Sequence, residues 1–320
     1  MIWPNVSNSY FAADSLAGMA ALFPDRYSVL FPEKNSASLI HKDLLPSKVR
    51  IIISGGAGNG PLFSGFVGPG LADACVCGAP FAAPNAYSIY ETASALDHEH
   101  GVLLLSNQFA GDLLNNDMAA DLLAMDHIQV RTFFCNDDIA TAVNNDRRER
   151  NGRAGIAILI KLAGCMSEKA YSLSEIYDEL ALASERLGTI SLTWDSLNEK
   201  FMIGSGFSGE PGLLELPENT TREEACNVAL SYLLKDLSPR ADEKIFFLIN
   251  RLRLTSYADS FIMSNHCKRL LDDHFSDNVI RIGSYSNISD QFGYTFSMLC
   301  MNKFWASLLS KPLSSHSFTI

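Results

Sequence analysis

Short apolar runs alternate with longer amphipathic stretches over the first 187 residues. Runs of four to six apolar residues bounded by turn residues are typical of buried strands, and apolar positions three or four apart indicate helices. We expect strands at 49–53, 101–105 and 130–135, and helices at 15–22, 86–95, 113–125, 155–167 and 174–187. The segment 32–48, rich in Pro, Ser and charge, is interpreted as an irregular tail. Alternating strands and helices predict a parallel sheet with helices on both faces.

Two details of this pattern can be tested in a structure. Asn85 precedes the second helix and is a candidate N-cap. In the helix 113–125, Leu114, Met118, Leu122 and Met125 recur at spacings of four, four and three, which predicts a buried apolar face.

The pattern changes near Gly188, where we place a domain boundary. Beyond it we expect strands at 190–192, 201–203, 245–250 and 279–282, helices at 223–234 and 260–274, and a closing strand pair at 294–300 and 304–309 with a turn at 301–303. The predicted organisation is therefore an N-terminal α/β domain, residues 1–187, and a C-terminal α/β domain, residues 188–320. Both are expected to contain mostly parallel sheets flanked by helices.

Composition narrows the function classes. The 320 residues are 47% hydrophobic and 19% charged, which is typical of a soluble globular protein with a large core. A net charge of −11 argues against a nucleic-acid-binding surface, and no apolar run approaches the roughly 20 residues of a membrane span. The N-terminus lacks the pattern of a secretory signal, so a cytoplasmic location is expected.

The seven cysteines are odd in number and scattered, as expected for reduced cytoplasmic thiols. Cys75 and Cys77 form the only close pair, which could be half of a zinc site or two thiols that line the core. The second interpretation is favoured, because no other ligand pair has metal-binding spacing.

A dense glycine turn follows the first of the predicted buried strands. Gly55, Gly56, Gly58 and Gly60 come directly after the isoleucine run 51–53. Glycine reaches φ > 0 and leaves room for a ligand near the backbone, so the turn is either a tight connection or a loop-built pocket at the end of a parallel sheet. No Lys follows as in a P-loop, and Pro61 stands where a dinucleotide fingerprint needs its third glycine. Binding of ATP or NAD on this loop is therefore rejected.

The ordered set of glycine-rich blocks resembles the substrate-binding K subunit of dihydroxyacetone (glycerone) kinase. The blocks are residues 54–61, 65–70, 76–84, 101–105, 111–115, 137–140, 153–155, 161–164 and 209–212. The resemblance spans most of the chain and is weakest at both ends. It implies two α/β domains whose glycine-rich loops form a pocket at the domain interface, between 55–60, 111–112 and 208–211.

The resemblance also implies which residues form the site. In this family a histidine captures the ketone as a hemiaminal and a second histidine acts as acid or base; here Ser208 and Asn59 hold these two catalytic positions. Gly60 replaces a family Glu and Asn107 a family Lys, whereas the family aspartate survives as Asp112. The implied substrate-binding residues are Gly56, Ala57, Gly58, Asn59, Asn107 and Asp112, with Asp112 accepting from ligand hydroxyls and the Gly56 and Gly58 amides donating.

Other side chains offer weaker alternatives. His98 and His100 could bind a metal, but a polar loop before a strand is favoured. Asp137 and Asp138 could bind Mg²⁺, but a capped polar turn is favoured, since this family places the metal and nucleotide on a separate domain. No cofactor or metal is therefore expected on this chain.

Two classes of function stay open, beside a third and less favoured one, a purely structural partner with a collapsed pocket. A serine hydroxyl is a poor nucleophile toward a ketone unless a base activates it, and asparagine cannot take a proton at neutral pH. These two residues therefore favour a degenerate or regulatory subunit that binds dihydroxyacetone, or a similar polyol or ketose, non-covalently. The alternative is an active kinase subunit that presents its substrate to a separate phosphate-donating (L-type) subunit. The resemblance further implies a homodimer, and a possible regulator protein as partner.

Overall fold

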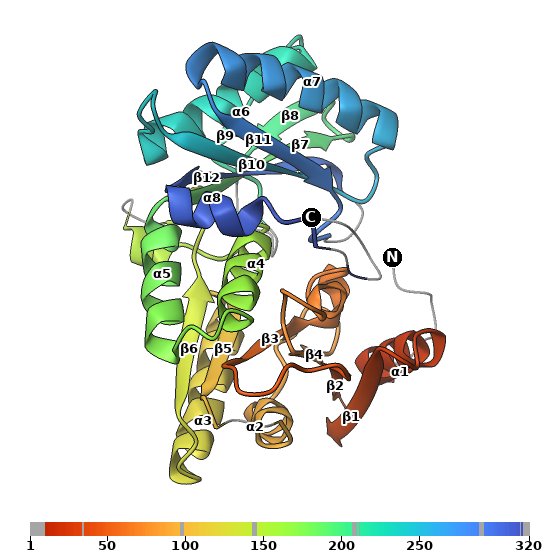
Figure 1. Ribbon diagram of the computed structural model, residues 1–320. Helices are drawn as coiled ribbons and strands as arrows, with labels where there is room; N and C mark the ends of the chain where they lie inside the picture. The colour runs from red at the N-terminus through yellow and green to blue at the C-terminus, as the bar shows by residue number, and fades with distance from the viewer. Residues whose placement is uncertain are drawn as a thin grey trace. The chain divides into compact units, whose positions relative to one another are not determined.

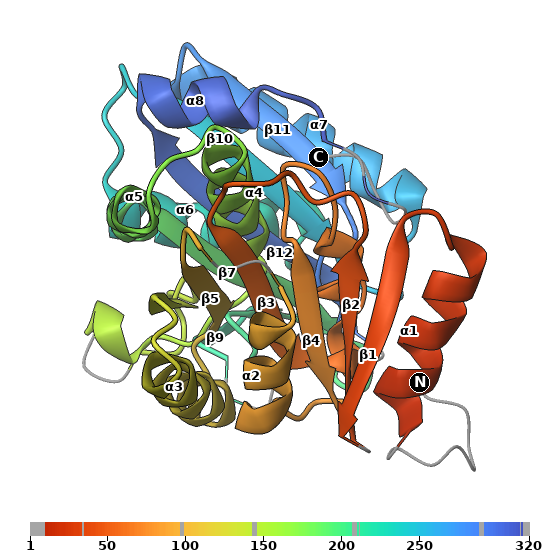
Figure 2. The same ribbon diagram turned by 60° about the horizontal axis from the view of Figure 1, so that its bottom comes forward.

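The chain folds into two compact units (Figures 1 and 2). The computed structural model describes residues 10–33, 35–96, 99–142, 146–206, 210, 212–287, 291–313 and 315. Unit 1 comprises Met1–Cys135, Ile156–Leu182 and Leu308–Ile320, and unit 2 comprises Asn136–Gly155 and Ala183–Ser307. The boundary expected at residues 187 and 188 stays a prediction; the nearest passage of the chain between the units lies at residues 182 and 183.

Unit 1 is built on a six-stranded sheet of order β1-β2-β4-β3-β5-β6. The strands are β1 (Tyr27–Glu33), β2 (Ser36–His41), β3 (Arg50–Gly56), β4 (Ala74–Gly78), β5 (Val102–Asn107) and β6 (Val130–Cys135). The four strands β4, β3, β5 and β6 are mutually parallel, as predicted for this half of the chain. Their carboxyl ends therefore lie at one edge of the sheet.

The interpretation of residues 32–48 as an irregular tail is wrong for the part up to residue 41, because β1 and β2 form an antiparallel pair that extends the sheet. It is correct for residues 42–48, which contain no helix or strand. The strand β2 is buried throughout in spite of its serines. The hydroxyls of Ser36 and Ser38 hydrogen-bond to Ser88 and Thr92 of the overlying helix α2. Satisfied hydroxyls are tolerated in a core, so the polar composition here did not indicate exposure.

Helices cover both faces of this sheet. They are α1 (Phe11–Leu22), α2 (Ala86–Ser94), α3 (Ala110–Met125), α4 (Ile156–Ser167) and α5 (Leu173–Glu185). Residues of α2 and α3 share one apolar cluster with alternate residues of β3, β4 and β5, whereas α4 packs on the other face (Figures 1 and 2). Asn85 caps α2 as predicted, accepting from the Ser88 amide at 2.7 Å.

The predicted apolar face of α3 is wrong. Leu114, Met118 and Met125 are 62%, 50% and 75% exposed. The buried residues of α3 are Asp112, Asn116, Ala119 and Leu123. The helix turns polar side chains of its first two turns inward, toward the strand ends, and this arrangement cannot be found from a search for apolar periodicity.

Unit 2 contains a second six-stranded sheet, of order β11-β10-β12-β7-β8-β9. The strands are β7 (Leu187–Asp195), β8 (Lys200–Ile203), β9 (Leu214–Glu215), β10 (Lys244–Arg251), β11 (Asn278–Gly283) and β12 (Phe292–Met301). The α/β class is confirmed, but a mostly parallel arrangement is wrong for this sheet, where only β10 and β11 pair in parallel. The four residues between β7 and β8 suffice for an antiparallel hairpin but not for a parallel crossover.

The helices of unit 2 are α6 (Arg222–Leu237), α7 (Tyr257–His274) and α8 (Lys303–Leu309, which ends in unit 1). Residues of α6 and α7 form one apolar core with β10 and β12 (Figure 1). The strand predicted at 304–309 is wrong, because α8 occupies it. The Asn302 side chain accepts from the Trp305 amide at 2.8 Å, which favours a helix start over a hairpin turn.

All seven cysteines are buried, and Cys75 and Cys77 line the core of unit 1. Across the described ranges, no cluster of three or more His, Cys, Asp or Glu side chains could hold a metal ion. No helix in the described part of the chain is long and apolar enough to cross a membrane.

Candidate functional site

Three loops meet at the carboxyl edge of the parallel strands β3, β4 and β5. They are the glycine turn after β3, the segment 79–84 after β4, and the passage from β5 into α3. A Cβ built on Gly56 would lie 2.9 Å from the Ala82 amide nitrogen, and one built on Gly111 would lie 3.4 Å from the Ala83 Cβ. The second loop is therefore in contact with the first and the third, and this edge of a parallel sheet is where α/β proteins place ligands.

These glycines are needed mainly because a side chain at their positions would clash with neighbouring residues. A Cβ on Gly55 would lie 2.0 Å from the Phe63 ring, and one on Gly58 would lie 2.6 Å from the Phe81 ring. Neither glycine has a positive φ, so the expectation that this turn needs left-handed backbone is not met at these positions. A short 3-10 turn, Ala57–Asn59, places Ala57, Gly58 and Asn59 half-buried at the rim, with Gly60 exposed.

Asp112 and Asn107 have buried oxygens available for a ligand. Asn107 ends β5 and Asp112 lies in the first turn of α3. Both side chains are buried, and the Oδ1 atom of each has no hydrogen-bond partner among the described residues. Leaving a buried polar atom unpaired costs roughly 1–3 kcal/mol, so two such acceptors on adjoining segments indicate a site that a hydroxyl-bearing ligand would complete.

A hydrogen-bonded chain holds this end of α3 against the strands. Ser106 Oγ donates to the Ser54 carbonyl at 2.8 Å, and Ser54 Oγ donates to Asn116 Oδ1 at 3.0 Å. Asn116 Nδ2 in turn donates to the Asp112 carbonyl at 2.8 Å. Sequence reasoning missed Ser54, Ser106 and Asn116, although a serine closing an apolar strand run was a signal that could have been used.

Burial raises the pKa of Asp112 to about 7, and the nearby Ser106 hydroxyl partly opposes that rise. The carboxyl group is therefore shared between its neutral and ionised forms at neutral pH. It can both donate to and accept from a ligand hydroxyl under these conditions.

This shift predicts a pH-dependent stability that Asp112→Asn removes. Because the pKa is higher in the folded than in the unfolded chain, its stabilising effect is complete below about pH 4 and is lost as the pH rises through about 7. Urea unfolding of both chains measures this effect. Between about pH 4 and 8, the free energy of unfolding of the unaltered chain should fall by about 2–3 kcal/mol relative to that of Asp112→Asn, allowing for partial access of water to the carboxyl group. A pH-independent difference between the two would contradict the burial of this carboxylate.

The loop that contains the Ser208 position belongs to unit 2. Ser208 itself lies outside the described residues, as do Phe207, Gly209 and Pro211. On its two sides, Gly206 N donates to the Glu210 carbonyl at 3.2 Å, and Asn151 Nδ2 donates to Glu210 Oε1 at 3.0 Å. Glu210 is thus tied to Gly206 and to the segment 136–155, and the interface pocket expected from the resemblance stays a prediction.

A buried ion pair anchors the first arm of this loop. Arg153 pairs with Asp138, and its guanidinium also donates to the Ser205 carbonyl. Burial raises the pKa of Asp138, and Arg153 opposes that rise. Asp137 accepts from the amides of Arg153 and Gly155.

These contacts agree with the capped polar turn that was favoured over a Mg²⁺ site for Asp137 and Asp138. Of the two candidate metal-binding histidines, His98 lies outside the described residues and His100 is in an exposed turn.

Comparisons with known proteins identify the family of the chain. The Dak1 domain family matches residues 17–317. The "PTS-dependent dihydroxyacetone kinase 2, dihydroxyacetone-binding subunit DhaK" of Listeria innocua is 28% identical over 98% of both chains. A subunit of the same description from Lactococcus lactis is 29% identical and covers 79% of this chain and 80% of its own length. The D-erythrulose kinase of Mycolicibacterium smegmatis is 28% identical over 83% of this chain and 49% of its own length.

Solved structures show the same fold. The dihydroxyacetone kinase of C. freundii in complex with AMP-PNP and Mg²⁺ superposes with a TM-score of 0.89 at 21% identity, covering 99% of this chain and 61% of its own. A structure described as the dihydroxyacetone kinase operon co-activator Dha-DhaQ has a TM-score of 0.85 at 22% identity, over 93% of this chain and 95% of its own. Matched along almost its whole length in sequence and in fold, the chain is a DhaK-like member of the Dak1 domain family.

Proposed function

We propose that the chain binds dihydroxyacetone, or a similar small polyol or ketose, non-covalently at the carboxyl edge of the first sheet. The observation that carries the proposal is the pair of buried, unpartnered acceptors Asn107 Oδ1 and Asp112 Oδ1 beside the glycine turn. Relatives that are about 28% identical are named as dihydroxyacetone-binding subunits, which supports this ligand class.

Non-covalent binding follows from the residues at the two positions that the family fills with histidine. Ser208 and Asn59 occupy them, and neither side chain is a ready nucleophile or base at neutral pH. The role that fits is a degenerate or regulatory cytoplasmic subunit, with a phosphate-donating subunit or a regulator protein as its partner. The alternative role, an active kinase subunit, is supported by the kinase names of the relatives.

Replacing Asp112 tests the site directly. Asp112→Ala should weaken dihydroxyacetone binding by about 5- to 150-fold, because losing a hydrogen-bond partner in a desolvated site costs roughly 1–3 kcal/mol. Isothermal titration calorimetry measures the change, with Asp121→Ala, an exposed acidic position on the same helix, as the matched control. Unchanged affinity in Asp112→Ala would remove this residue from the site.

A homodimer is proposed from the family resemblance alone. The chain has a mass of 35.1 kDa, so sedimentation equilibrium at micromolar concentration should report about twice that value. A species of a single chain's mass under these conditions would contradict the dimer.

A further inference from the structure

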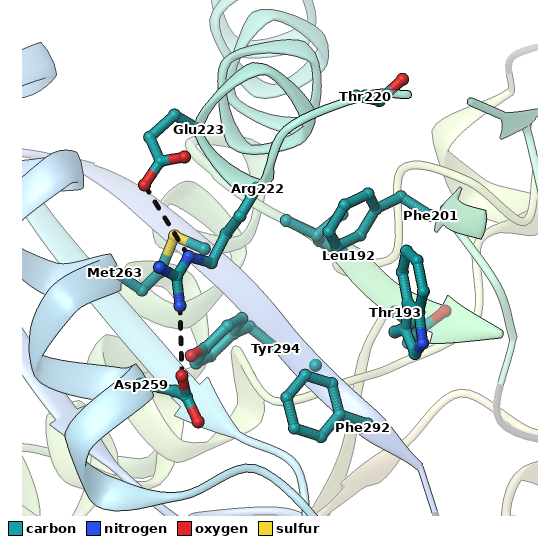
Figure 3. A pocket seen from close by; sticks show the side chains of 12 residues that line it. Leu192, Thr193, Phe201, Thr220, Arg222, Glu223, Asp259, Met263, Phe292 and Tyr294 are labelled. Carbon is teal, nitrogen blue, oxygen red and sulfur yellow. Dashed lines mark hydrogen bonds and ion pairs between the residues drawn. The ribbon is translucent and has the colours of Figure 1, made fainter. Parts of the chain in front are cut away.

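Unit 2 contains a cavity that shares no residue with the proposed dihydroxyacetone site. Its volume is about 590 Å³, within the range typical of small-molecule pockets. It opens above the ends of β7, β8 and β12 and is bounded by the first turns of α6 and α7 (Figure 3). The residues that line it are Leu192, Thr193, Trp194, Phe201, Thr220, Arg222, Glu223, Asp259, Met263, Phe292, Gly293 and Tyr294.

The walls of this cavity are apolar and rich in aromatic rings. Trp194 and Phe201 pack edge to face with their centroids 4.7 Å apart. Phe292 and Tyr294 come from the neighbouring strand β12 and present further rings to the same space (Figure 3). Aromatic walls give a ligand large contact area and offer their negative faces to a cation.

One end of the cavity has a net negative charge, from one arginine and two carboxylates. Arg222 Nη1 lies 3.1 Å from Asp259 Oδ1, and Arg222 Nε lies 3.8 Å from Glu223 Oε1 (Figure 3). The second contact is an ion pair beyond hydrogen-bond distance, and the buried Nε has no hydrogen-bond acceptor among the described residues. The single guanidinium is therefore shared by two carboxylates, which leaves one net negative charge at this end. A carboxylate ligand would add to that charge.

The N-terminus of α6 is partly occupied by its own side chains. Thr221 and Glu224 form a capping box, in which the Thr221 side chain accepts from the Glu224 amide and the Glu224 carboxylate accepts from the Thr221 amide. An amide already engaged in a cap is not offered to a ligand.

A polar atom without a partner also faces this end. The Tyr294 side chain is buried, and its hydroxyl makes no hydrogen bond to the described residues, although the Ser260 side chain is near enough to oppose the rise in its pKa. The ring is directed with its hydroxyl toward the Arg222–Asp259 pair (Figure 3). Burial raises the pKa of Tyr294 to about 12, so the hydroxyl stays neutral and can accept a hydrogen bond from a cationic head group.

We propose that this cavity binds a small aromatic or alkyl amine in its protonated form, with the apolar body among Trp194, Phe201 and Phe292 and the ammonium group beside Glu223 and Tyr294. The inference does not depend on the proposed polyol function, because it concerns a different set of residues and a different ligand class.

A pair of probes of equal shape and opposite charge tests the proposal on the full chain. 3-Phenylpropylamine and 3-phenylpropionate are titrated by calorimetry at pH 7, with the tryptophan fluorescence of the chain, to which Trp194 contributes, as a second readout. The amine should bind at least ~10-fold more tightly than the carboxylate. Equal or tighter binding of the carboxylate, or binding of neither probe at millimolar concentration, would overturn the proposal.

Three variants locate the binding. Glu223→Gln, a half-buried position near the helix start, should weaken amine binding by about 5-fold or more while leaving the fold intact. Phe201→Ala should weaken it by about 10-fold through the lost aromatic wall, whereas Phe261→Ala, an exposed phenylalanine on α7 outside the lining, should leave it unchanged. An equal loss in Phe261→Ala and Phe201→Ala would contradict binding in this cavity.

The same variants reveal whether a second copy of the chain covers the cavity instead. If Phe201→Ala changes the sedimentation coefficient and neither probe binds the unaltered chain, the cavity is part of an interface and the amine proposal is wrong.

Discussion

Mixed with a phosphate-donating subunit and dihydroxyacetone, the chain is expected to turn over roughly 10²- to 10⁴-fold more slowly than a relative with both family histidines. Asn59 cannot act as the base that abstracts the substrate proton, and Ser208 cannot hold the ketone covalently as a histidine does. Loss of covalent capture also loosens the orientation of the reacting hydroxyl, and positioning can supply several kcal/mol. The two losses need not add, since residues that act together are non-additive.

The measurement is the initial rate of phosphorylation with dihydroxyacetone and, separately, with erythrulose, since several relatives are named as erythrulose kinases. The double variant Asn59→His with Ser208→His should regain part of the lost rate if the loops keep their backbone. Rapid turnover of dihydroxyacetone by the unaltered chain would overturn the degenerate role. Rapid turnover of erythrulose alone would show an enzyme of altered specificity.

The second large expected effect is the loss of stability when the Arg153–Asp138 ion pair, which anchors the loop that contains Ser208, is broken. Arg153→Leu is expected to lower the free energy of unfolding by about 3–5 kcal/mol, because it leaves Asp138 buried without its partner. It also removes the donor to the Ser205 carbonyl, so the loop should loosen at the same time. Urea unfolding at pH 7 measures the first effect, and amide hydrogen exchange over residues 204–212 measures the second.

The matched control is Arg148→Leu, in the same segment. Arg148 pairs with Asp146 in solvent, with 88% of its side chain exposed, so its loss should hardly change the stability. Adding Asp138→Asn to Arg153→Leu removes the uncompensated charge and should restore part of the stability. An Arg153→Leu chain as stable as the Arg148→Leu chain would contradict the role of this pair.

The parallel strands β3 and β5 and the helix α4 follow directly from uniform apolar runs. The strand β6 and the helices α2, α5 and α7 are less uniform in sequence but were also predicted close to their observed bounds. The pairing direction in unit 2 was missed because apolar run length does not encode strand direction. The strand β2 and the inward face of α3 were missed for a related reason. Their buried serines and Asn116 are satisfied by hydrogen bonds that only the folded chain brings together.

The candidate site, like the fold, could be predicted only in part from the sequence. The resemblance located Asp112 and Asn107, and the structure adds that both are buried with an unpartnered oxygen. Neither the raised pKa of Asp112 nor the chain of contacts from Ser106 through Ser54 to Asn116 could be inferred from residue spacing. These properties depend on burial and on contacts between segments distant in sequence.

Carbon-13 NMR of dihydroxyacetone labelled at the carbonyl carbon shows whether the chain holds its ligand without a covalent bond. We expect that bound ligand exchanges fully with free ligand, that no resonance of a protein-attached tetrahedral carbon appears, and that Asp112→Ala diminishes the binding. A tetrahedral-carbon resonance that stays with the protein after free ligand is removed would show covalent capture, and the proposed non-covalent binding would then be wrong.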